Sequence, residues 1–255
     1  MKESKSKFLI LAPHPDDEVV GTCILIKRGV QFGHEFYIFF LTNGCISKNE
    51  LWHYQKSKHN QRLNARLNEM KKTTELLKIE RYFLQNIPSR TLRNNINETI
   101  KKISEIIKTY KITTLLAPAY EGGHQDHDVA NFIASRFRNC INVLEFSEYN
   151  YFNKTKRSNK FIEEFGNEKK ILLNENEIKF KKMALNIYQS EKKNLTYIKV
   201  KEECYRNLVA YNYNIKPHEG KLFYQRFNFF SWHPRVDGTN PMLICKILKD
   251  ISLQK

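Results

Sequence analysis

The chain has 255 residues, of which 41% are hydrophobic and 13% aromatic, and its formal net charge is +16 at pH 7. This length suits one large α/β domain or two small ones, and the composition excludes a disordered chain. No apolar run approaches the ~20 residues that cross a bilayer, so we expect no transmembrane helix. The basic N-terminus lacks a signal-type apolar region, and a cytoplasmic location is expected.

The positive charge allows two explanations. It could attract a polyanionic partner, such as nucleic acid, an anionic membrane surface or a phosphorylated substrate. It could also reflect a lysine-rich composition, which we favour because the basic residues are spread along the chain without a nucleic-acid-binding motif. The five cysteines are scattered without a C-x-x-C pair. We therefore expect reduced packing residues rather than disulfides or a cysteine zinc site.

The first half of the chain alternates between strand and helix patterns. Short apolar runs end in turn signals, and segments with apolar residues at helical spacing separate them. Repeated strand–helix–strand units predict a Rossmann-like, doubly wound α/β fold with a mainly parallel sheet and helices on both faces. The expected strands are 8–12, 35–41, 81–84, 112–117 and 142–146, and the expected helices are 19–30, 58–78, 96–110 and 127–137.

The second half has a less regular pattern. Residues 153–168 are polar and rich in Lys and Asn, which predicts a surface loop, and helical patterns follow at 175–189 and 200–210. The aromatic-rich segment 220–232 predicts a hairpin or an edge strand. Because no internal repeat or linker interrupts the chain, we expect a single domain over 1–255 with a C-terminal elaboration from about residue 150.

A histidine and three acids stand directly after the first expected strand. The segment reads His14-Pro15-Asp16-Asp17-Glu18, and a helical pattern begins behind it. Acids beside a buried strand are costly unless they are paired or serve a site. His14 and Asp17 could share a metal ion while Asp16 accepts a proton. Alternatively, such acids could be ordinary helix-start residues, favoured by capping or by the helix dipole.

A second cluster of histidines and acids follows the strand expected at 112–117. Residues 124–128 read H-Q-D-H-D and again precede a helical pattern. Ligands of an open parallel sheet bind beyond the carboxyl ends of its strands, so both clusters are predicted to meet at one edge. Either cluster alone is a weak signal. Two clusters at two strand ends predict a functional site.

Together the clusters supply enough ligands for one catalytic metal ion. Two imidazoles and one carboxylate suit zinc and leave an open coordination position. The ion would activate water and polarise a carbonyl, and a free carboxylate could accept the water proton. A further histidine could stabilise the oxyanion or protonate the leaving amine. The expected ligands are His14, Asp17 and His127, with Asp16 as the base and His124, oriented by Asp126, as the further histidine.

Three motifs resemble those of the PIG-L (LmbE-like) zinc-dependent deacetylases. They are H-P-D-D-E after the first strand, T-N-G after the second and H-x-D-H after a later one, over about residues 8–140. A weaker likeness runs from Lys182 to Ser190. The resemblance implies one zinc ion per chain and removal of an N-acetyl group from an amino sugar or glycoconjugate. By position it implies the zinc ligands His14, Asp17 and His127, the general base Asp16, the oxyanion-stabilising His124 and its partner Asp126.

Arg66 matches the R-x-x-E pattern of this family, whose arginine contacts a polar group of the substrate in some members. An intrahelical ion pair with Glu69 is the alternative. The chain departs from the family pattern with H-Q-D-H in place of H-P-D-H and with Q-S-E in the third motif. The first departure leaves the zinc ligands intact, and neither identifies the substrate. Glu18 has no assigned role.

Three rivals to this hydrolase stay open. One is a same-fold amidase that acts on a thiol conjugate or a nucleoside-linked sugar. Another is a basic module that binds nucleic acid or acidic lipid, although we expect a small-molecule or glycoconjugate substrate instead. The third, a dinucleotide-binding domain, lacks a G-x-G-x-x-G loop, and its acids would repel a pyrophosphate. Tyr149, Tyr151 and Trp232 could stack on a sugar, with packing as the favoured role.

Overall fold

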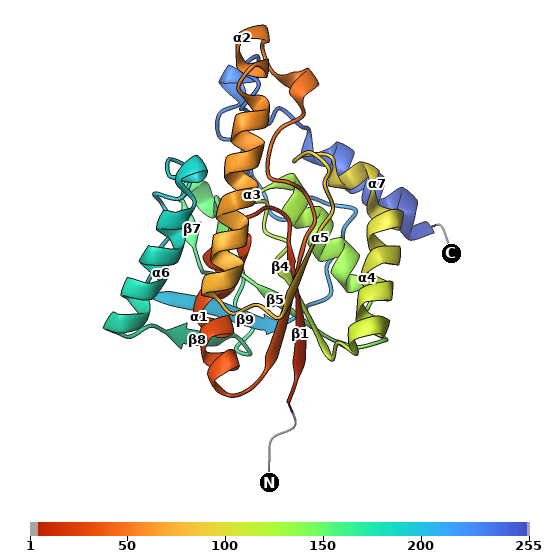
Figure 1. Ribbon diagram of the computed structural model, residues 1–255. Helices are drawn as coiled ribbons and strands as arrows, with labels where there is room; N and C mark the ends of the chain where they lie inside the picture. The colour runs from red at the N-terminus through yellow and green to blue at the C-terminus, as the bar shows by residue number, and fades with distance from the viewer. Residues whose placement is uncertain (1–4, 254–255) are drawn as a thin grey trace.

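The computed structural model describes residues 5–253 and has a seven-stranded sheet at its centre (Figure 1). The strands of this sheet are β1 (Lys7–Ala12), β2 (Glu35–Phe40), β3 (Arg81–Leu84), β4 (Thr114–Pro118), β5 (Asn142–Phe146), β8 (Lys169–Leu172) and β9 (Glu202–Asn207). They lie in the order β3-β2-β1-β4-β5-β9-β8. Pairs from β3 to β5 are parallel, whereas β9 is antiparallel to β5 and β8. The predicted mainly parallel α/β sheet is confirmed.

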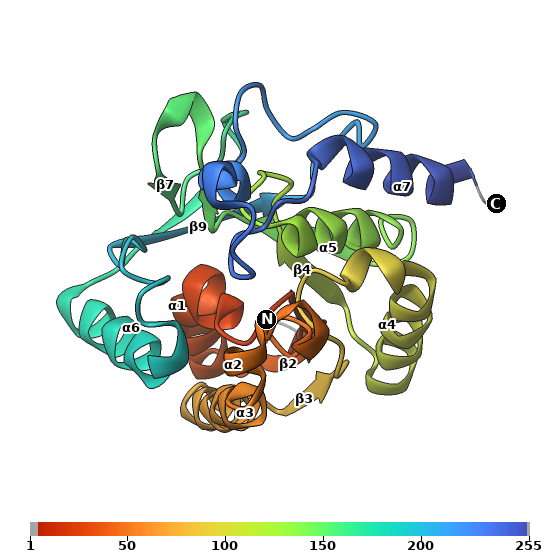
Figure 2. The same ribbon diagram turned by 90° about the horizontal axis from the view of Figure 1, so that it is seen from above.

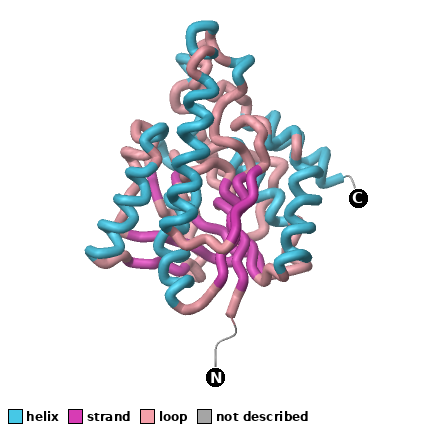
Figure 3. The backbone as a smooth tube through the Cα atoms, in the orientation of Figure 1, coloured by secondary structure: helices cyan, strands magenta, loops and turns pink. Residues whose placement is uncertain are grey.

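Helices cover both faces of the sheet (Figures 2 and 3). One layer consists of α1 (Asp17–Gln31), α3 (His59–Leu76) and α6 (Glu175–Ile187), and the other of α4 (Ile96–Tyr110), α5 (Gln125–Ser135) and α7 (Pro241–Leu253). A short helix, α2 (His53–Lys56), precedes α3, and β6 (Tyr149–Asn150) pairs with β7 (Arg157–Ser158) in a separate ribbon. Within residues 5–253, no helix combines the length and apolarity that crossing a membrane requires.

The central strands divide the apolar side chains between two cores. Leu9 and Leu11 of β1 pack toward α4, α5 and α7, whereas Ile10 and Ala12 pack toward α1, α3 and α6. Successive side chains of a strand point to opposite faces, so a strand covered on both faces must be apolar throughout. This explains why the strands before both clusters appear as continuous apolar runs. All five cysteines are free; Cys23, Cys204 and Cys245 are buried, whereas Cys140 is exposed.

The fold brings the two clusters to one edge of the sheet. β1 and β4 are parallel neighbours, with Phe8 opposite Thr114 and Ile10 opposite Leu116. Their carboxyl ends therefore lie side by side, and the segments that lead into α1 and α5 both begin there. The predicted convergence of residues 13–18 and 119–128 at this edge is confirmed.

Two expectations for the second half are wrong. Residues 200–210 were predicted to be helical, but they contain β9, where buried Glu203 pairs with Lys181 and buried Arg206 pairs with Glu145. Charged residues that are buried by tertiary pairing imitate a polar helix face in the sequence. Segment 220–232 has two 3-10 turns, Phe223–Gln225 and Asn228–Phe230, instead of a hairpin or an edge strand. Its aromatic residues pack in turns rather than in a ladder.

Candidate metal and catalytic site

The turn between β1 and α1 holds Asp16 in a strained backbone conformation, with φ at 132°. The backbone N–H of Asp16 donates to Glu18 Oε2 at 2.9 Å. The other oxygen of Glu18 accepts hydrogen bonds from Thr73 Oγ1 of α3 at 2.9 Å and from the Tyr188 hydroxyl, just after α6, at 2.5 Å. Glu18 is fully buried. Glu18, to which the sequence assigned no role, thus links the strained turn to α3 and to the end of α6.

Three donor atoms from the two clusters face one another at nearly equal distances. Asp17 Oδ2 lies 3.3 Å from His14 Nδ1 and 3.2 Å from His127 Nε2, and the two nitrogens are 3.3 Å apart. All three residues are buried. Ligand atoms of a tetrahedral zinc ion with bonds of about 2.0–2.1 Å stand roughly 3.3–3.4 Å apart. The donor set therefore fits such an ion in both chemistry and spacing.

Each histidine of this triangle has a carboxylate at its other ring nitrogen. Asp126 Oδ2 lies 3.1 Å from His14 Nε2, and Glu148 Oε2 lies 3.3 Å from His127 Nδ1. Carboxylates in such positions fix the orientation of metal-binding imidazoles and raise their basicity. Glu148 follows β5, another of the parallel strands that end at this edge. Sequence reasoning missed it, and its place after a strand was the only signal that could have found it.

Asp126 contacts His14 more closely than His124, the ring that it was predicted to orient. Asp126 Oδ2 is 3.7 Å from His124 Nδ1, against 3.1 Å from His14 Nε2. His124 Nδ1 instead lies 3.1 Å from the backbone nitrogen of Asp126, whose N–H it accepts. A neutral His124 ring with this acceptor carries its proton on Nε2, from which it can donate. A second group that could hold a cation consists of His14, His124 and Asp126. Its histidine nitrogen His124 Nδ1, however, already accepts the backbone N–H of Asp126.

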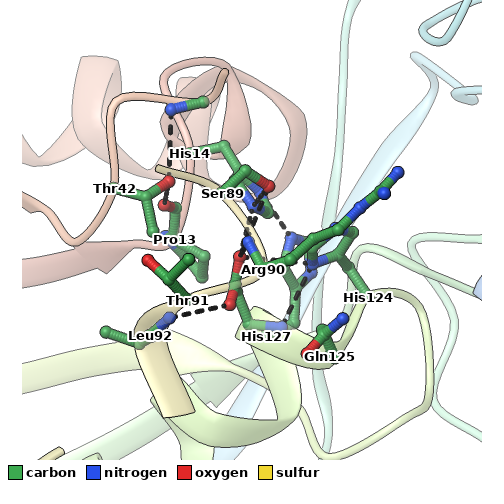
Figure 4. Close-up of polar contacts among 12 residues, drawn as sticks. Pro13, His14, Thr42, Ser89, Arg90, Thr91, Leu92, His124, Gln125 and His127 are labelled. Atoms are coloured by element: carbon green, nitrogen blue, oxygen red, sulfur yellow. Dashed lines mark hydrogen bonds and ion pairs between the residues drawn. The ribbon is translucent and has the colours of Figure 1, made fainter. Parts of the chain in front are cut away.

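The loop after β3 supplies two contacts that sequence reasoning missed (Figure 4). Ser89 Oγ lies 3.1 Å from His14 Nε2, and the backbone N–H of Arg90 donates to Asp126 Oδ2 at 2.6 Å. Arg90 has φ of 70°, in the left-handed region that residues other than glycine rarely adopt. A loop without acids or histidines gave no signal, because its contribution comes from a hydroxyl and a peptide group.

Burial and neighbouring charges determine which rings carry protons. Burial lowers the pKa of His14, but hydrogen bonds to Asp126 and Asp17 outweigh it and raise the pKa to about 10. Burial and the charge of His14 lower the pKa of His124 to about 3, so this ring is neutral at pH 7. A cation at the triangle would replace the positive charge that His14 otherwise takes from a proton.

The adjacent carboxyls of Asp16 and Asp17 titrate in opposite directions. Burial raises the pKa of Asp16 well above its usual range, although Arg66 opposes the shift. Burial also opposes ionisation of Asp17, yet His127 and His14 lower its pKa well below the usual range. Asp17 is therefore the anionic member of the triangle, and Asp16 has an increased affinity for a proton.

Arg66 of α3 is buried against the candidate base. One guanidinium nitrogen lies 3.5 Å from Asp16 Oδ2 and another 3.2 Å from Glu191 Oε1. The alternative pairing with Glu69 does not form, because Glu69 accepts the backbone N–H of Ser190 at 3.0 Å. Ser190 and Glu191 belong to the Q-S-E segment that departs from the family pattern. Arg66 thus links that segment to Asp16, and its substrate contact stays a prediction.

The segments that build this site are similar to those of known proteins. A family model described as PIG-L, GlcNAc-PI de-N-acetylase, matches residues 9–137, which include both clusters. A deacetylase in the biosynthesis pathway of teicoplanin has a similar fold, with a TM-score of 0.63 and 13% identity over 79% of this chain and 97% of that one. A zinc-inhibited form of teicoplanin deacetylase gives 0.58 and 14% over 79% and 97%.

A third similar structure is the N,N'-diacetylchitobiose deacetylase from Pyrococcus horikoshii in complex with its inhibitor MPG. Its TM-score is 0.54, with 17% identity over 80% of this chain and 84% of that one. Similarity at these identities establishes a common fold. The family model covers the segments that build the donor triangle and the carboxylate beside it.

Proposed function

The chain belongs to the PIG-L family of GlcNAc-PI de-N-acetylases, and from this premise we propose that it is a metal-dependent N-deacetylase of an amino sugar or glycoconjugate. The observation that carries the proposal is the donor triangle beside a free carboxylate. His14, Asp17 and His127 offer a cation three ligands. Asp16 is outside this set and pairs with Arg66. This separates metal binding from proton transfer.

The residues that would hold the ion are His14, Asp17 and His127, and zinc is the proposed ion. Two imidazoles and one carboxylate suit it, and three protein ligands leave room for water or substrate. When bound, it supplies Lewis acidity toward the water and the acetyl carbonyl. Asp126 keeps the ring of His14 oriented through its second nitrogen, and Glu148 lies beside the second nitrogen of His127.

Asp16 acts as the general base in the proposed hydrolysis. It takes a proton from the water whose oxygen bonds to the acetyl carbon, and its raised pKa favours that transfer. Neutral His124 donates its Nε2–H to the carbonyl oxygen as negative charge develops there. The carbon–nitrogen bond then breaks, and Asp16 returns the proton to the nitrogen. The products are acetate and a free amine.

Acetate release from a panel of N-acetylated sugars, with and without added zinc, tests the proposal. The parent chain is expected to release acetate only when it is loaded with metal. Glu98→Gln on the exposed surface of α4 serves as a control that should behave as the parent. Equal release by metal-free and metal-loaded protein would contradict metal dependence, and inertness of the loaded chain toward simple and lipid-linked acetylated sugars would contradict deacetylation.

A further inference from the structure

A cleft of about 470 Å³ opens between the segment before α3 and the loop that precedes α7. Figure 1 shows these two parts of the chain side by side beyond the strand ends. We propose that this cleft is a subsite for a neutral saccharide unit attached to the acetylated sugar, an inference that rests on the proposed function. The side chains that carry the argument are Glu50, Trp52, Arg90, Arg93, Trp232 and Asp237.

Hydrogen bonds connect the cleft to the segment 124–128, which carries Asp126. Arg90 donates its backbone N–H to Asp126 at 2.6 Å, while its guanidinium donates to the carbonyl oxygens of Pro234 and Arg235, each at 2.9 Å. One residue therefore contacts both the carboxylate that orients His14 and the loop that forms the far wall. Arg90 thus connects the cleft to a segment that contributes to the donor triangle.

Gln125 forms a second link between the cleft and the segment 124–128. Its side-chain amide donates to Asp237 Oδ2 at 2.7 Å and to Thr239 Oγ1 at 2.9 Å, and its oxygen accepts from Arg93. Gln125 occupies the position where this chain departs from the H-P-D-H pattern, and a proline there could make none of these contacts. This departure from the family pattern therefore holds Arg93, Asp237 and Thr239, three residues that line the cleft.

Two tryptophans form an aromatic surface in the cleft. The rings of Trp52 and Trp232 stack with centroids 5.8 Å apart and planes inclined by 12°, and His233 contacts Trp52 edge-on at 4.8 Å. Trp232 is 65% exposed despite this stacking. An exposed aromatic surface with polar groups around it marks a ligand site, and the apolar face of a pyranose ring packs on such a surface.

The charges of the cleft indicate a neutral ligand. Arg90 and Arg93 are balanced by Glu50 and Asp237, and the guanidinium of Arg90 approaches Glu50 at 4.0 Å. A phosphate site would need an excess of cations, because each anionic oxygen seeks charged donors. Balanced donors and acceptors around an aromatic surface instead match a ring that carries hydroxyl groups. The overall charge of +16 is thus not concentrated here.

Calorimetric titration of the full chain carrying Asp16→Asn, which should bind sugars without cleaving them, tests the subsite. The probes are N,N'-diacetylchitobiose, N-acetylglucosamine and N-acetylglucosamine 1-phosphate. We expect the disaccharide to bind most tightly, and Trp232→Ala to reduce its advantage over the monosaccharide roughly tenfold. Phe229→Ala is the matched control, because this neighbouring aromatic is 88% exposed and does not line the cleft.

The outcomes separate this inference from the proposed function. Disaccharide affinity that is unchanged in both Trp232→Ala and Trp52→Ala would overturn the subsite, as would the absence of any disaccharide preference while the parent chain still releases acetate. Tighter binding of the phosphorylated sugar would overturn its neutral character. Disaccharide binding that depends on Trp232, in a chain that cleaves no acetylated sugar, would support the subsite and contradict the deacetylase.

Discussion

The two halves of the molecule contribute differently to one site. Residues 5–150 carry the donor triangle and the candidate base at the ends of parallel strands. Short sequence motifs predicted these site residues. Residues 151–253 supply supporting contacts, such as those of Tyr188 with Glu18 and Glu191 with Arg66, from turns and helix ends. The reactive groups lie where parallel strands of the sheet end, whereas the residues that support them are positioned by tertiary packing.

This comparison makes a graded prediction. Changes in the donor triangle or at Asp16 should abolish metal binding or turnover, and changes in the second half should lower stability or alter substrate preference. A second-half substitution that removed the metal, or a change in the donor triangle that altered only preference, would break the distinction.

The largest effect is expected from Asp16→Asn. It removes the group that accepts the water proton, so kcat should fall by about 10²–10⁴-fold. Metal content should stay at the level of the parent, because Asp16 is outside the donor triangle. Steady-state kinetics and metal analysis on the same preparation measure both quantities. Full activity of this variant would remove Asp16 from the mechanism.

Glu148→Gln should weaken metal binding by about 10–100-fold, because the carboxylate beside His127 Nδ1 is replaced by an amide. Competition with a chromophoric chelator gives the dissociation constant. Glu145→Gln is the matched control, since Glu145 is equally buried on β5 but pairs with Arg206. If both variants weakened metal binding alike, the contact of Glu148 with His127 would not be the cause.

Metal affinity should rise with pH. Asp126 and Asp17 raise the pKa of His14 to about 10, so a proton occupies this ring throughout the neutral range and a cation must displace it. Displacement of one proton makes the apparent affinity increase by about tenfold per pH unit below that pKa. Chelator competition between pH 6 and pH 8 measures the slope. A flat profile would show that His14 binds the cation without losing a proton.

The smallest effect is expected in the second half. Tyr188→Phe deletes the hydroxyl that donates to buried Glu18, so the free energy of unfolding should fall by about 1–3 kcal/mol. Metal affinity should not change, since no ligand is touched. Urea denaturation measures the loss, with Tyr54→Phe as a control at a 65% exposed tyrosine. Unchanged stability would mean that the hydroxyl does not support the turn.

Sequence reasoning worked where one physical signal dominated. Continuous apolar runs identified β1 and β4, and the rule for parallel sheets then brought His14 and His127 to one edge. It failed for β9, where Glu203 and Arg206 are buried through partners that are distant in the chain. A sequence pattern cannot show such pairing.

The same limit applies to the site. Glu148 and Ser89 act through contacts with residues far away in sequence, so no local pattern marks them. The closer contact of Asp126 with His14 escaped the sequence for a related reason. Proximity in the chain suggested His124, but the loop after β3 turns the carboxylate toward His14. The cytoplasmic location and the identity of the metal stay predictions.

Metal stoichiometry in the parent chain and in His14→Ala, His127→Ala and His53→Ala variants tests the central claim most directly. The donor triangle predicts one divalent ion per parent chain and per His53→Ala chain, since His53 lies exposed at the start of α2. It predicts loss of the ion from the other two variants. An undiminished metal content in both His14→Ala and His127→Ala would contradict the account.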